Sequence, residues 1–155
     1  APVVYAIALF PLSISAWKSY DVITHKTRPS KKEKYQNLNA NNLEVHRYEQ
    51  DILTYMQQEK PFLRGGYSLK DLSKDIDIPS HLISWTLNQH LQTNFSSLVN
   101  QHRVEYAAKL LHDSSFDHYS ISGIALEAGF NSVSVFNQHF KKRMGLTPSV
   151  FRKRN

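Results

Sequence analysis

The chain of 155 residues contains no cysteine and only five glycines, and it has no glycine-rich loop of the kind that cradles a phosphate. The absence of cysteine excludes disulfide bonds, thiolate zinc sites and a cysteine nucleophile. No His-Glu-x-x-His pattern, nucleophile motif or recognisable carboxylate pair occurs either. We therefore expect no enzyme, no cofactor and no metal site, and we interpret the eight histidines as scattered surface residues.

The residues that are present describe a basic globular protein. Hydrophobic residues make up 41% of the chain, which is enough for a core, and the formal net charge is +6. Basic side chains gather in residues 18–35 and 100–155, whereas residues 36–99 are slightly acidic. Because Lys and Arg side chains hold a polyanion, a basic block that coincides with a helical motif indicates contacts with phosphates. A solvated basic surface is the alternative.

The N-terminal residues form an apolar segment followed by a basic one. Residues 1–17 carry no charge, although Pro11 interrupts them and they fall slightly short of the roughly 20 residues of a membrane-spanning helix. Trp17 and Tyr20 suit a membrane interface, and the Lys and Arg residues that follow suit its cytoplasmic side. We interpret residues 1–20 as the end of a transmembrane region and residues 21–42 as a polar linker. An apolar strand or helix packed on the domain is the alternative for residues 1–17.

The remainder of the chain has helical periodicity. Apolar residues recur at helical spacing in residues 43–58, and Pro61 and the Gly65-Gly66 pair then end that segment. After Ser68 no alternating run is long enough for a strand, so we predict an all-α fold. We expect a helix and turn at 43–66, followed by a domain at 67–155 with helices at about 68–76, 80–91, 94–112, 120–128, 132–144 and 147–153.

One pattern in this domain occurs twice. Residues 68–73 (SLKDLS) are echoed by residues 120–125 (SISGIA), and each opening leads through a short break into a second helix. This arrangement predicts two helix-turn-helix units, joined by the long helix at 94–112. The residues expected in the two cores are Leu72, Ile76, Ile78, Ile83 and Leu87 in the first, and Ile121, Ile124, Ala128, Phe130, Phe136, Phe140 and Phe151 in the second.

The second helix of each unit supplies the candidate DNA contacts. In a helix-turn-helix this helix lies in the major groove, with its N-terminal residues toward the base edges. Gln138 suits a bidentate pair with adenine, and valines suit contact with thymine methyl groups. Arg103, by contrast, is expected to be held by an acidic partner inside the domain. We expect Leu82, Ile83, Leu87, Phe136 and Phe140 to be buried, so the candidates for base contacts are residues on the outward faces of these two helices. They are His81, Ser84, Trp85, Val133, Ser134, Val135 and Gln138. The candidates for backbone contacts are Ser80, Asn88, Gln89, Asn131, Ser132, Lys141, Lys142 and Arg143.

Three segments carry a family resemblance. Residues 103–111 (RVEYAAKLL), 124–142 (IALEAGFNSVSVFNQHFKK) and 145–152 (GLTPSVFR) resemble the DNA-binding domain of the AraC/XylS family of bacterial transcription regulators. The resemblance covers about residues 67–153. It implies two helix-turn-helix subdomains that bind consecutive major-groove segments, with base contacts at the seven residues given above. Residues 34–38 (KYQNL) also resemble a subgroup whose regulatory part is an integral membrane domain.

The first unit departs from this family pattern. Asp77 and Gln92 stand where the family often has glycine, and its first-unit base readers are often Arg or Gln, where this chain has His81, Ser84 and Trp85. We therefore expect the second unit to be the stronger reader of DNA. The predicted function is a sequence-specific transcription regulator on the cytoplasmic face of the cell membrane. Double-stranded DNA is the expected partner, and RNA polymerase, the membrane and a second copy of the chain are further candidates. A helical protein-interaction module with a basic face is the alternative.

Overall fold

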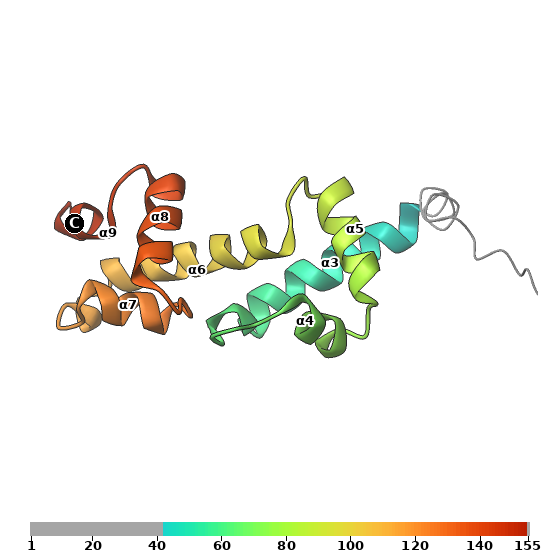
Figure 1. Ribbon diagram of the computed structural model, residues 1–155, viewed down its shortest axis with the longest axis horizontal. Helices are drawn as coiled ribbons and strands as arrows, with labels where there is room; N and C mark the ends of the chain where they lie inside the picture. The colour runs from blue at the N-terminus through green and yellow to red at the C-terminus, as the bar shows by residue number, and fades with distance from the viewer. Residues whose placement is uncertain (1–41, 155) are drawn as a thin grey trace, which may run out of the picture. The chain divides into compact units, whose positions relative to one another are not determined.

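The computed structural model describes residues 42–154, and within this range the chain forms helices and no strand (Figure 1). This confirms the all-α fold class. The first and last residues of every predicted helix lie within two residues of those of an observed helix. The predicted membrane segment and linker lie outside the described residues. The elements are α3 (Asn42–Gln58), η1 (Pro61–Leu63), α4 (Leu69–Asp75), α5 (Ser80–Gln89), α6 (Phe95–His112), η2 (Ser114–Phe116), α7 (Ile121–Glu127), α8 (Val133–Met144) and α9 (Pro148–Lys153).

Side-chain caps fix where several of these helices begin. The Ser68 hydroxyl accepts a hydrogen bond from the Asp71 amide at 3.2 Å, and the Asp71 carboxylate accepts one from the Ser68 amide at 3.0 Å, which completes a capping box. The Ser68 hydroxyl also donates to the Asp71 carboxylate, and this bond, with the one from the Ser68 amide, lowers the pKa of Asp71. Thr147 caps α9 in the same manner, with Pro148 at the first helical position. The caps at Ser68 and Thr147 thus fix where α4 and α9 begin.

The first subdomain consists of α3, α4, α5 and the first half of α6. Its core combines Leu72, Ile83 and Leu87 with Ile52 and Met56 of α3, and all five side chains are fully buried. Helix α3 therefore packs against α5 and completes the core of this helix-turn-helix unit. Residue 67, predicted as the first residue of the domain, lies inside the packed unit, which extends back to Asn42. Leu82, expected to be buried, is only partly buried at the edge of this core.

The second subdomain consists of the rest of α6 with α7, α8 and α9. Phe136 and Phe140 of α8 are fully buried against Ile124 and Ala128, as predicted. Helix α6 supplies Leu98 and Val99 to the first core and its later apolar residues to the second, so a single 18-residue helix joins the two subdomains. The residues that α6 contributes to the second core are Val104, Ala107, Ala108, Leu110 and Leu111.

A turn between α3 and α4, residues 61–66, connects the first subdomain to the second. Arg103 of α6 donates from Nε to the Phe62 carbonyl at 2.7 Å and from Nη2 to the Arg64 carbonyl at 3.1 Å. The prediction of an acidic partner for Arg103 is therefore wrong, because its partners are backbone oxygens. Gly129, in the turn before α8, faces the same segment, with the Leu63 Cα 2.9 Å from where a Cβ would stand. We call residues 61–66 the docking turn.

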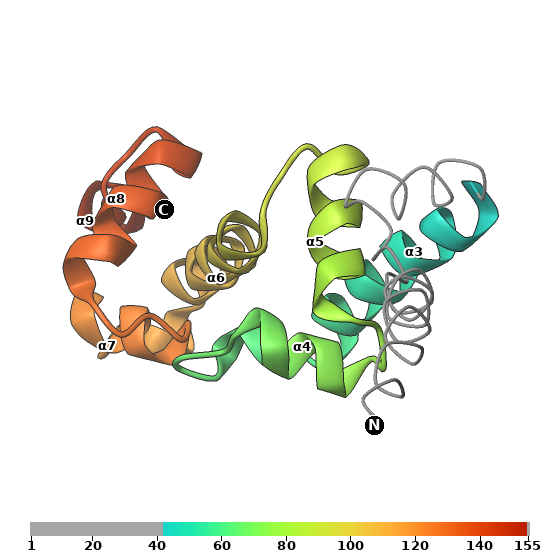
Figure 2. The same ribbon diagram turned by 45° about the vertical axis from the view of Figure 1, so that its right-hand side comes forward.

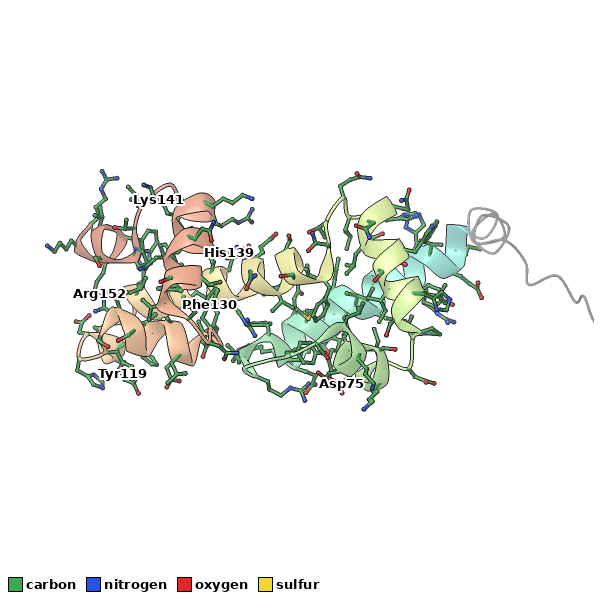
Figure 3. The ribbon with its side chains drawn as sticks, in the orientation of Figure 1. Asp75, Tyr119, Phe130, His139, Lys141 and Arg152 are labelled. Carbon is green, nitrogen blue, oxygen red and sulfur yellow. The ribbon has the colours of Figure 1, made fainter. Side chains whose placement is uncertain are left out.

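An acidic side chain fastens the docking turn to α4. Asp75 accepts a hydrogen bond from Arg64 at 2.7 Å and one from the Tyr67 hydroxyl at 3.2 Å (labelled in Figure 3). Burial works to raise the pKa of Asp75, but the hydrogen bonds from Arg64, Tyr55 and Tyr67 prevail and lower it. Burial and the neighbouring Asp75 charge raise the pKa of Tyr67, so this hydroxyl remains a donor. The docking turn is thus held from both sides, by Asp75 and by Arg103.

His102 makes the stability of this connection depend on pH. The His102 ring stacks on the Phe62 ring with 5.3 Å between the ring centroids, and burial lowers the pKa of His102 from the ordinary 6.5. As the pH falls, the unfolded chain therefore binds a proton at His102 before the folded chain does. The free energy of unfolding keeps its full value above the ordinary pKa and declines below it. We expect the free energy of unfolding to fall between about pH 7 and pH 5.5, and His102→Gln to reduce that fall. Urea unfolding across this range checks the prediction, with His118→Gln as the control; equal pH profiles for the wild type and His102→Gln would contradict it.

Candidate nucleic-acid interface

Two helices, one in each subdomain, expose polar faces. Helices α5 and α8 are the second helices of the two helix-turn-helix units, and they lie toward opposite ends of α6 (Figures 1 and 2). Each buries one face in its own subdomain, which leaves the other face to solvent. In this arrangement α6 joins the second helices of two helix-turn-helix units.

The exposed face of α8 contains the residues predicted to read bases in the second unit. Ser134 and Gln138 are exposed, and Val133 and Val135 are 41% and 42% exposed. Phe136 of the same helix is fully buried. Because burial of Phe136 fixes the rotation of α8, Ser134 and Gln138 point away from the core, and Val133 and Val135 flank Phe136 at the two edges of the exposed face.

The two ends of α8 have different electrostatic character. Ser132 caps the first turn by accepting from the Val135 amide at 3.5 Å, and Asn131 is exposed beside it. Lys141 and Lys142 are exposed in the last turn, and Figure 3 shows Lys141 near the upper end of the helix. Arg143 differs from these lysines because its Nη2 lies 2.9 Å from the Glu105 carboxylate of α6. Arg143 would therefore have to exchange Glu105 for a phosphate.

The exposed face of α5 is narrower than that of α8. His81 is exposed, but Ser84 and Trp85 are only partly exposed, and the Trp85 ring lies 5.6 Å from that of His90. Asn88 is exposed and donates to the Ser84 carbonyl of its own helix at 2.8 Å. The other two candidates at this helix, Ser80 and Gln89, are partly exposed and exposed respectively.

The turns of the two units differ in backbone conformation. Asp77 and Gln92 adopt φ angles of 52° and 48°, in the left-handed region that favours glycine. The corresponding turns of the second unit have Gly129 at 84° and Gly145 at 74°. The first unit therefore keeps the same chain path as the second while placing non-glycine residues at both positions.

A cleft lies between the two subdomains beside α8. Its volume is about 460 Å³, and it is lined by the starts of α4, α6 and α8 together with Arg103. Asn94 and Ser132 cap α6 and α8 where they meet this cleft. These caps already accept hydrogen bonds from the Ser97 and Val135 amides in the first turns of the two helices.

Several structural roles were not found from the sequence. Arg152 is half-buried and donates to the Tyr119 carbonyl at 2.8 Å, so it holds α9 against the loop before α7 (Figure 3). His139 Nε2 of α8 lies 3.4 Å from Nδ2, the side-chain amide nitrogen, of Asn100 in α6. The pairing of Arg143 with Glu105 joins elements 38 residues apart, and no local spacing could have indicated it.

The fold and the two exposed helices define a double helix-turn-helix domain. The chain matches the family described as "Helix-turn-helix domain" over residues 72–154, which is just over half of its length. It therefore belongs to that family. Because the match begins within α4, it includes both recognition helices and leaves α3 outside.

Relatives and solved structures agree with this assignment. The transcriptional regulatory protein HptR of Staphylococcus aureus is 27% identical over 101 residues, a match that covers 63% of this chain and 38% of HptR. The C-terminal domain of AraT, a response regulator from Geobacillus stearothermophilus, is 28% identical with a TM-score of 0.56, covering 72% of this chain and 84% of that one.

An AraC-type structure shares the fold. A transcriptional regulator from Chromobacterium violaceum, described as containing an AraC-type DNA-binding domain, is 24% identical with a TM-score of 0.51, covering 56% of this chain and 75% of that one. This structure shares the fold of the chain, and the assignment to a helix-turn-helix family rests on the match over residues 72–154. Among residues 42–154, no helix is both long enough and apolar enough to cross a bilayer.

Proposed function

We propose that this chain is a DNA-binding regulator of transcription that reads two consecutive major-groove segments with α5 and α8. The observation that carries the proposal is the outward face of α8. Gln138 points away from the fully buried Phe136, the two partly exposed valines flank that residue, and Lys141 and Lys142 follow at the end of the helix. Base-reading groups next to phosphate-binding groups on one rigid helix are what major-groove recognition requires.

The two helices contribute unequally in this proposal. Helix α8 presents four exposed candidates, including a glutamine that can pair with adenine through two hydrogen bonds. On α5, Trp85 is partly covered and Asn88 is engaged with its own helix. We therefore assign most of the base readout to α8 and mainly a positioning role to α5. The seven base contacts and eight backbone contacts predicted from the sequence remain proposals, and Arg143 is the backbone candidate that must first leave Glu105.

The packed unit extends the proposed DNA-binding domain beyond its predicted start. Ile52 and Met56 of α3 complete the core against which α5 lies, so we propose that the domain begins near Asn42. An enzyme is disfavoured, because the family and the fold are those of DNA-binding regulators. A protein-interaction module is disfavoured as well, because a helix that docks on a partner normally presents a broader apolar stripe than α8 does. Binding to RNA polymerase, dimerisation and attachment to a membrane remain predictions from the sequence.

Gln138→Ala tests the assignment of base readout to α8. At the preferred site we expect a loss of about 1–3 kcal/mol in binding free energy and a relaxed preference at one base pair. Fluorescence anisotropy with the preferred duplex and its single-base variants measures both effects. Gln57→Ala removes the same exposed side chain from α3 and should leave both quantities unchanged. A loss that is equal on every duplex would contradict base readout by Gln138.

A further inference from the structure

A group of metal-ligating side chains lies away from the proposed DNA contacts of α8. Ligand atoms of His46, Glu49 and His90 all fall within 4.8 Å of one another. His46 and Glu49 lie one turn apart on the same face of α3, with His46 Nδ1 3.6 Å from Glu49 Oε2. His90 follows the last residue of α5, and its ring lies 5.8 Å from that of His46. We call these three residues the histidine cluster.

The donor set determines which ion fits. Two imidazole nitrogens and one carboxylate oxygen suit a borderline divalent ion such as Zn²⁺, whereas Ca²⁺ and Mg²⁺ prefer oxygen ligands throughout. Three protein ligands also leave a fourth tetrahedral position for water, and His46 stands at the solvent side of the cluster, with 64% of its side chain exposed. We propose that the histidine cluster is a Zn²⁺ site that fastens α3 to the end of α5.

The distances are close to those of a formed site. Bonds of 2.0–2.1 Å to a tetrahedral ion place ligand atoms about 3.4 Å apart. The pair formed by His46 and Glu49 is already near that separation, and no pair has to close by more than roughly 1.4 Å. His46 can rotate because it is largely exposed. On the other side, the Trp85 ring lies 5.6 Å from His90 and limits how far that imidazole can turn.

The proposed ion would act on the first recognition helix. Helix α5 ends at Gln89, directly before His90, with no basic residue in its last turn, and α3 packs along α5. An ion bound by His46 and His90 would therefore tie the first turns of α3 to the point where the recognition helix ends. Because Zn²⁺ binds the folded arrangement of ligands from two helices, it should stabilise the first subdomain. This inference does not depend on DNA binding.

Zinc titration of the full chain tests the site. After treatment with a chelator, the protein is titrated with ZnCl₂ alone by isothermal calorimetry, and its melting temperature is measured with Zn²⁺ and with EDTA. We expect one ion per chain and a higher melting temperature with Zn²⁺. Loss of an outer-sphere partner alone costs 10–100-fold in affinity, so His90→Ala, which removes a ligand, should cost at least about 100-fold and abolish the shift. His118→Ala, an exposed histidine of the second subdomain, is the matched control and should behave as the wild type.

Two further measurements keep the result decisive. Glu49→Gln keeps the size of the side chain, so it replaces His90→Ala if that variant does not fold in EDTA. Substitution with Co²⁺ should give visible d–d bands in the wild type that disappear in both variants. Zinc binding of equal strength in the wild type, His90→Ala and Glu49→Gln would overturn the proposal. Binding that requires roughly millimolar Zn²⁺, far weaker than structural sites, would overturn it as well.

Discussion

Gly129→Ala is expected to lower the free energy of unfolding by about 2–5 kcal/mol. A left-handed conformation costs a non-glycine residue roughly 1–2 kcal/mol, and Gly129 has a φ angle of 84°. A methyl group there would also overlap the Phe62 carbonyl oxygen and approach the Leu63 Cα at 2.9 Å. Backbone atoms cannot rotate away as a side chain can, so this overlap adds about 1–3 kcal/mol. Urea unfolding of the full chain measures the sum.

Two other glycines separate these contributions. Gly66 and Gly145 have φ angles of 78° and 74°, but no atom lies within 4 Å of where their Cβ would stand. Gly66→Ala and Gly145→Ala should therefore show the conformational cost alone, about 1–2 kcal/mol each. If Gly129→Ala cost no more than these controls, close packing of the docking turn against the turn before α8 would contribute nothing to stability.

Replacing Lys141 and Lys142 together with glutamine is expected to weaken DNA binding by about 10–100-fold at physiological salt. Both side chains are exposed in the last turn of α8, where the helix would pass the phosphate backbone. Each phosphate contact contributes about −0.9 to the slope of log affinity against log salt concentration. Loss of two contacts should therefore make this slope less steep by roughly two. The loss should be similar on the preferred duplex and on a scrambled one, because phosphates carry no sequence information.

A second pair of lysines controls for net charge. Lys60 and Lys109 line a different cleft, on the side of α6 that holds Tyr106. Their joint replacement with glutamine removes the same charge and should change the salt slope by much less. Equal effects of the two double variants would mean that overall charge, and not the position of Lys141 and Lys142, determines affinity.

Local sequence signals predicted the helices well, because helix formation here depends on short-range features. The spacing of Phe136 and Phe140 specifies the buried face of α8, and Ser68 with Asp71 specifies where α4 begins. Once a buried face is known, the outward face follows from helix geometry. The exposed positions of Ser134 and Gln138 could therefore be predicted without a structure.

The connections between the subdomains could not be predicted in this way. Arg103 binds two backbone carbonyls some 40 residues away, and every residue has a carbonyl, so no acceptor side chain marks the partner. Helical spacing in residues 43–58 was visible, but nothing in it showed that α3 completes the core of the first unit.

Selection of bound sites from a pool of random duplexes, carried out with the wild-type chain and with Gln138→Ala, tests the central proposal most directly. Two recognition helices on one connecting helix should enrich two short blocks of preferred bases, with centres about one helical turn, 10–10.5 base pairs, apart. The block read by α8 should be the stronger one, and Gln138→Ala should relax one position within it while leaving the other block unchanged. Recovery of no preferred sequence, or of a site that Gln138→Ala leaves unaltered, would contradict it.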